Sequence, residues 1–156
     1  MEQIYQLLQS YYNFQTSILR SMAFETMTKA EFGRVTGLYG NSKDRRHRNP
    51  KLWSPSEIYA FSLRLGVWDG VSKRLQSLAV LINCLPEEEK KSVLKASLLT
   101  EEKLQIRIQQ YESWLPQELE KLYTFYHQNS ITHAGVPGQG HPAKKGSTDY
   151  KPIGSY

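Results

Sequence analysis

The residues of this chain best suited to chemistry form a basic run in its first half. From Asn41 to Arg48 the sequence reads Asn-Ser-Lys-Asp-Arg-Arg-His-Arg. Residues 28–66 hold eight basic and three acidic residues, so this stretch alone carries a charge equal to the net +5 of the 156-residue chain. A positive charge concentrated in one short stretch indicates a polyanionic partner more specifically than a high isoelectric point does.

Two helix starts flank the basic run. Thr28 and Glu31 have the spacing of a capping box, in which the hydroxyl accepts from the glutamate N–H and the carboxylate accepts from the threonine N–H. Ser54 and Glu57 repeat this spacing, with a proline at the first helical position between them. The sequence therefore predicts helices that begin at residues 29 and 55, on either side of the basic run.

Glycine and proline mark the ends of the elements between these helix starts. Gly37 stands where a helix of residues 29–37 ends in a left-handed residue. A short helix at 41–48 is expected to stop before Pro50, because the residue that precedes a proline disfavours the α region. Gly33 costs about 1 kcal/mol inside a helix, and the close approach of another backbone would explain it. Trp53 is interpreted as a core anchor.

The order of capped helix, glycine turn and short basic helix is the order of a helix-turn-helix, which places one helix in the major groove of DNA. The relevant residues are Thr28-Lys29-Ala30-Glu31-Phe32-Gly33, then Gly37-Leu38, the basic run, and Pro55 to Leu65-Gly66-Val67. In these features residues 14–67 resemble the Cro/repressor-type (XRE-like) helix-turn-helix family. The chain departs from that pattern where Lys43 and Arg46 replace apolar anchors of the third helix, and where Tyr39 replaces a small hydroxyl residue.

The resemblance implies a double-stranded DNA partner and a role in transcription regulation. Asn41, Ser42 and Lys43 would lie at the end of the recognition helix that reaches base edges. Arg45 would follow on guanine or phosphate, with Arg46 joining if the helix is rotated. The residues nearer the DNA backbone would be Lys29, Arg48 and Lys51.

Two other interpretations remain open. The basic run can be a solvated loop between two core helices, which is what most charge runs are. Alternatively, the chain can be a helical protein–protein interaction module that keeps the helix-turn-helix scaffold without reading bases. The polar residues Lys43 and Arg46 at the anchor positions motivate this alternative.

The rest of the chain predicts an all-α fold. Apolar spacing predicts an amphipathic helix over 2–22, with Gln15 as a polar gap that allows two helices instead of one, and further helices over 70–84 and from Pro86. Residues 100–128 carry an apolar seam that can pack on the domain or form a homodimer through 104–126, with a kink or break before Pro116. The expected organisation is a helix-turn-helix bundle at 1–67, a helical extension at 68–128 and a flexible tail at 129–156.

Several functions find no support in the sequence. It holds no nucleophile–base pattern, phosphate-binding glycine loop or paired carboxylates, so we expect neither an enzyme nor a cofactor. His127, His133 and His141 have no acidic partner nearby, so no metal site is expected. The single cysteine, Cys84, excludes an internal disulfide and is interpreted as a small buried side chain. No apolar run has the length of a membrane span and no signal peptide is apparent, so we expect a cytoplasmic protein.

Overall fold

The structure, a computed structural model, describes residues 2–23, 28–40, 45, 46, 48–67 and 71–134. The described residues form helices and their connections, and these ranges contain no strand, which confirms the all-α prediction. The elements are α1 (Glu2–Ala23), α2 (Lys29–Thr36), the 3₁₀ turn η1 (Pro50–Leu52), α4 (Pro55–Arg64), α5 (Val71–Asn83), α6 (Glu87–Ser97), α7 (Glu101–Gln109), the 3₁₀ turn η2 (Tyr111–Ser113) and α8 (Pro116–Ala134).

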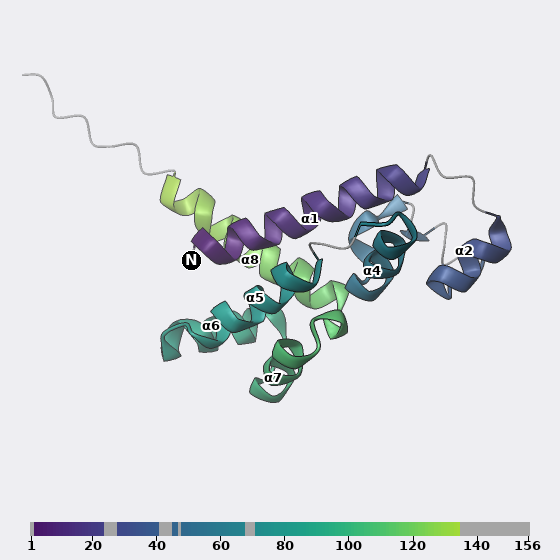
Figure 1. Cartoon of the computed structure of the whole chain (residues 1–156). Coiled ribbons are helices and arrows are strands. Elements are labelled where there is room, and N and C mark those ends of the chain that lie inside the picture. Colours follow the sequence, from purple (N-terminus) through teal and green to yellow (C-terminus); the bar gives the residue numbers. More distant parts are fainter. Residues whose placement is uncertain (1, 24–27, 41–44, 47, 68–70, 135–156) are drawn as a thin grey trace, which may run out of the picture.

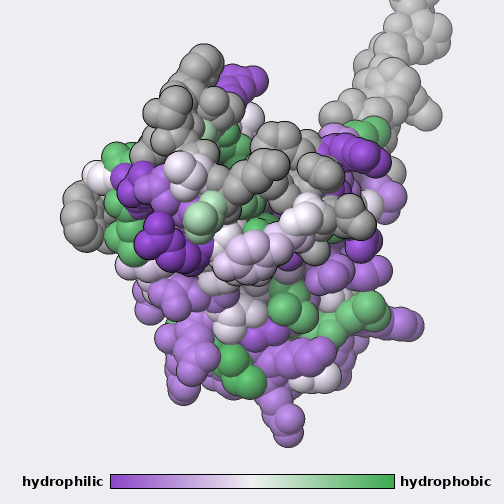
Figure 2. Space-filling view, turned by 90° about the vertical axis from the view of Figure 1, so that its right-hand side faces the viewer, coloured by the Kyte–Doolittle hydropathy of each residue, from purple (hydrophilic) through white to green (hydrophobic). Residues whose placement is uncertain are grey.

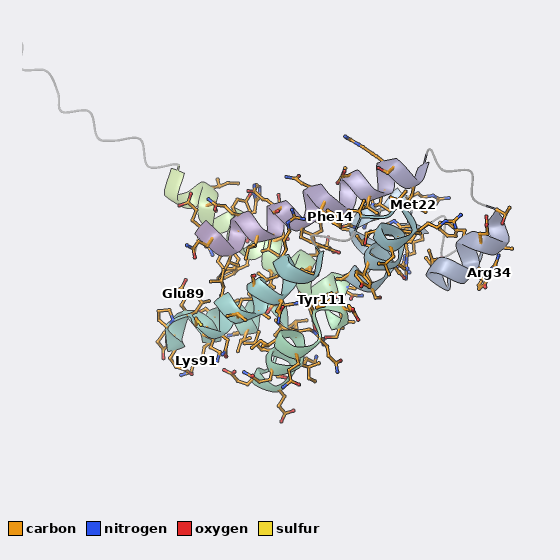
Figure 3. All side chains as sticks on the ribbon, viewed as in Figure 1. Phe14, Met22, Arg34, Glu89, Lys91 and Tyr111 are labelled. Atoms are coloured by element: carbon orange, nitrogen blue, oxygen red, sulfur yellow. The ribbon has the colours of Figure 1, made fainter. Side chains whose placement is uncertain are left out.

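The long helix α1 extends along the bundle, and α4, α5 and α8 all pack against it (Figure 1). Helix α6 packs on α8, and α7 packs on α5, whereas α2 packs on α4 at the opposite end of the molecule from α6. Phe14 and Met22 lie on the side of α1 that faces the other helices (Figure 3). One buried core includes Leu8 of α1, Phe61 of α4 and Leu122 of α8. The described elements on both sides of residue 67 therefore share one core.

Helix α1 runs unbroken through Gln15, where the sequence left two helices open. Gln15 is buried, and its Nε2 donates a hydrogen bond to the carbonyl of Pro50 in η1. A buried amide needs such a partner, because an unpaired polar group loses its hydration without compensation. The polar gap in the apolar stripe is therefore the site of a tertiary hydrogen bond.

Both predicted capping boxes are present. The Thr28 hydroxyl accepts from the Glu31 N–H at 3.2 Å, and the Glu31 carboxylate accepts from the Thr28 N–H at 3.1 Å. Ser54 and Glu57 form the equivalent bonds at 3.3 and 2.9 Å. Gly37 follows α2 with φ of 69°, as predicted for a left-handed helix end.

Gly33 has a different explanation from the one the sequence suggested. A Cβ added at Gly33 would come 2.7 Å from Cζ of Tyr39. Its close neighbour is thus an aromatic ring from the turn after α2, and the expected backbone approach is not what fills this space. Tyr39 lies over Gly33 with 68% of its surface exposed.

The helical segment of residues 100–128 is broken before Pro116, as the proline predicted, into α7, η2 and α8. Three seam residues, Leu104, Leu119 and Leu122, are buried in the core of the chain itself. At the break, Arg107 donates to both carboxylate oxygens of Glu118 at 2.9 and 2.8 Å. These three seam residues therefore pack within this chain, whereas Leu115 of the same seam is 48% exposed.

Two other expectations need correction. Cys84 is exposed, because α5 ends at Asn83 and the cysteine falls in the following turn. Helix α8 extends to Ala134, six residues into the predicted flexible tail, and residues 135–156 lie outside the described part of the chain. Over the described ranges, we find no helix with the length and apolar character that crossing a bilayer requires.

Candidate nucleic-acid interface

The basic run contributes a helical segment between α2 and α4. Its described residues, Arg45, Arg46 and Arg48, are helical, and the Asn49 N–H donates to the Arg45 carbonyl at 3.1 Å. Asn49 then adopts an extended conformation and caps η1, accepting from the Lys51 N–H at 3.3 Å. The predicted stop before Pro50 is confirmed, and η1 links the basic segment directly to α4.

Arg46 points into the protein. Its Nη1 forms an ion pair with Oε1 of Glu57, and its Cζ lies 5.6 Å from the ring centroid of Trp53. The other oxygen of Glu57 caps α4 through the Ser54 N–H, so one carboxylate holds both the basic segment and the helix start. Burial lowers the pKa of the Arg46 guanidinium. Arg46 is therefore the anchor of the segment, occupying the position where the resembled family has an apolar residue.

The surface that receives Arg46 is an aromatic cluster. Trp53 is buried, as predicted, and its ring lies 5.1 Å from Phe61 of α4 and 6.1 Å from Phe32 of α2, both edge-on. This cluster joins α2 to α4. The basic segment is thus attached to packed aromatic residues of both helices, and edge-to-face pairs of this kind add about 0.5–1.5 kcal/mol beyond the burial of their area.

Arg45 and Arg48 are exposed. Three residues apart on a helix, their side chains lie on neighbouring positions of one face. They are the described members of the basic run that present guanidinium groups to solvent. Two such groups can bind phosphates or, in the major groove, the O6 and N7 atoms of guanine.

Lys51, which the resemblance placed near the DNA backbone, lies over aromatic rings. Its Nζ is 5.5 Å from the ring centroid of Tyr12 in α1 and 4.9 Å from that of Tyr123 in α8. Tyr12 and Tyr123 meet edge to face at 5.3 Å. The Lys51 ammonium is therefore engaged within the protein.

Four predicted contacts belong to the segment before Arg45 and to the start of α2. Asn41, Ser42 and Lys43 lie outside the described residues. Lys29 is the first residue of α2, but its side chain is also outside the described part. The structure thus brings Arg45, Arg46, Arg48 and Lys51 into one region, with Arg46 and Lys51 directed inward.

The acidic groups near α2 are held in local contacts. Hydrogen bonds from the Thr28 N–H and hydroxyl lower the pKa of Glu31. Glu31 also lies 3.8 Å from the Arg64 guanidinium of α4.

The acidic start of α6 is remote from the basic segment: Glu89 of α6 and Arg34 of α2 lie at opposite ends of the molecule (Figure 3). The end that carries α2 faces the reader in Figure 2, where the most hydrophilic side chains lie on the upper half of the face.

Four residues of this region escaped the sequence interpretation: Gln15, Glu57 in its second role, Tyr12 and Tyr123. A polar residue inside an apolar stripe was the available signal for Gln15. No local pattern pairs Lys51 with Tyr12, 39 positions earlier in the chain, or with Tyr123, 72 positions later.

No protein-family model, characterised protein or solved structure matches the chain. Among the described residues there is also no group of three or more histidine, cysteine, aspartate or glutamate side chains that could hold a metal ion.

Proposed function

We propose that this chain is a cytoplasmic DNA-binding protein, a transcriptional regulator that places the basic segment 41–48 in the major groove. The observation that carries the proposal is the opposite placement of neighbouring arginines. Arg46 attaches the segment to Trp53 and Glu57, while Arg45 and Arg48 are exposed. A helix fixed on one side can present its other side to a groove without first having to order itself.

In this proposal Arg45 and Arg48 bind guanine edges or phosphates, and Asn41, Ser42, Lys43 and Lys29 complete the contacts. Glu57 and Trp53 set the rotation of the segment through Arg46. The proposal does not depend on a homodimer through 104–126, where Leu104, Leu119 and Leu122 are buried within the chain and Leu115 is 48% exposed. The expected species in light scattering at micromolar concentration is a monomer.

The proposal is tested by fluorescence anisotropy with a labelled random-sequence duplex at low salt. Arg45→Glu and Arg48→Glu should each raise the dissociation constant about tenfold, since each loses a contact and adds repulsion. Lys121→Glu is the matched control, because Lys121 is an exposed residue of α8 and the charge change is the same. Equal effects of all three variants would contradict the proposal.

A protein–protein interaction module is the second candidate. It is favoured by the engagement of Arg46 and Lys51, two of the predicted DNA contacts, within the protein. Recovery of one protein partner in a pull-down, with no salt-sensitive DNA binding by the purified chain, would favour it over the first proposal.

A further inference from the structure

Lys51 connects two helices that are far apart in the sequence, α1 and α8. It belongs to η1, directly after the basic segment, yet its ammonium lies on rings from α1 and α8. Cations are attracted to the electron-rich faces of aromatic rings within about 6 Å of the centroid. Both distances, 5.5 Å to Tyr12 and 4.9 Å to Tyr123, are inside this limit. The two rings meet at 83°, so together they present two adjoining walls to the ammonium.

The α8 side of this contact is itself held in place. The His127 ring stacks on Tyr123 with 5.7 Å between centroids and 8° between planes. The Tyr5 hydroxyl and His127 Nδ1 form a hydrogen bond of 2.8 Å, which connects this stack to the start of α1. The Tyr123 ring that contacts Lys51 is therefore also packed against His127.

A second contact holds the same turn. Gln15 of α1, three residues after Tyr12, donates to the carbonyl of Pro50. Asn49 directly precedes η1. Its N–H donates to the Arg45 carbonyl, which is the last helical hydrogen bond of the basic segment. Because η1 is short and follows this bond directly, fixing η1 also fixes the end of the segment that carries Arg45 and Arg48.

We propose that Lys51 is a positioning residue, and that α8, through Tyr123, belongs to the DNA-binding unit. This inference rests on the proposed function and adds one residue to it: Lys51 contributes to DNA affinity by holding η1 against Tyr12 and Tyr123, without binding phosphate. Helix α8 then helps to determine how the basic segment is presented.

The first test compares Lys51→Met with Lys121→Met by anisotropy over a range of salt concentrations. A positioning role predicts that Lys51→Met weakens binding about 3- to 10-fold, because fewer molecules hold the segment in the competent position. The slope of log K against log salt should stay unchanged, whereas loss of a phosphate contact flattens it by about 0.9. Lys51→Arg should restore affinity, and Tyr123→Leu should reproduce the Lys51→Met effect without adding to it.

The second test uses the protein without DNA. Hydrogen exchange at the amides of Asn49 and Trp53, which donate to Arg45 and Pro50, should accelerate in Lys51→Met and remain unchanged in Lys121→Met. Unchanged exchange together with a flatter salt slope would overturn the inference and make Lys51 a phosphate contact. If exchange accelerates but the unaltered chain shows no salt-sensitive DNA binding, the proposed function fails while the holding role of Lys51 stands.

Discussion

The anchoring of the basic segment by Arg46 predicts a measurable loss of stability in Arg46→Met. The substitution keeps an aliphatic chain of similar length and removes the charge. The side chains of Arg46 and Glu57 are 24% and 13% exposed, so this ion pair is partly buried. A surface pair contributes at most about 1 kcal/mol, and disrupting a buried pair costs about 3–5 kcal/mol, so the cost of breaking this pair lies between the two. With about 0.5–1 kcal/mol for the contact with Trp53, the expected loss in the free energy of unfolding is about 2 kcal/mol.

Urea unfolding followed by tryptophan fluorescence measures this loss, with Arg45→Met as the matched control. Arg45 is exposed, so its replacement should change the free energy of unfolding by less than about 0.5 kcal/mol. Glu57→Gln isolates the ion pair, because glutamine also serves at this position of a capping box. A double-mutant cycle between Arg46→Met and Glu57→Gln should give a coupling energy of about 1 kcal/mol. Equal effects of Arg46→Met and Arg45→Met, with no coupling to Glu57, would refute the anchoring role.

Two further predictions concern packing. Gly33→Ala should be nearly neutral in the presence of Tyr39, because the tyrosine ring must move to admit the added methyl group. In a Tyr39→Ala background the same substitution should stabilise the protein by up to about 1 kcal/mol, the difference in helix propensity. Equal effects in both backgrounds, measured by thermal unfolding, would argue against the contact. Arg107→Met should cost about 3 kcal/mol, because it leaves the buried Glu118 carboxylate without its charged partner. Adding Glu118→Gln should recover part of that loss in urea unfolding, and purely additive losses would contradict a coupled pair.

The features that the sequence predicted correctly depend on residues close together in the chain. The capping boxes at Thr28 and Ser54 need only a partner three residues later, and the left-handed Gly37 needs only its own lack of a side chain. Local chemistry of this kind determines where helices begin and end, whatever the rest of the fold does. The break before Pro116 has the same origin, since proline cannot donate the hydrogen bond that a continuous helix requires there.

The features that could not be predicted depend on the rotation and packing of helices. The composition of the basic run shows many cations, but which one faces inward depends on where Glu57 and Trp53 lie after folding. In the same way, Gln15 interrupts an apolar stripe in order to bond to the Pro50 carbonyl. That carbonyl is 35 residues away, so no local pattern could identify it as the partner. The sequence set Arg46 apart from Arg45 only by its place at an anchor position, and the structure identifies the partners that hold it, Glu57 and Trp53.

The salt dependence of DNA binding tests the central claim most directly. The unaltered chain should bind a random duplex with a log–log slope of about −2 or steeper, with Arg45 and Arg48 each contributing about 0.9. The Arg45→Met, Arg48→Met double variant should flatten the slope by about 1.8, while Lys121→Met leaves it unchanged. A slope near zero for the unaltered chain, or the same slope in the double variant, would contradict the assignment of these two arginines to DNA.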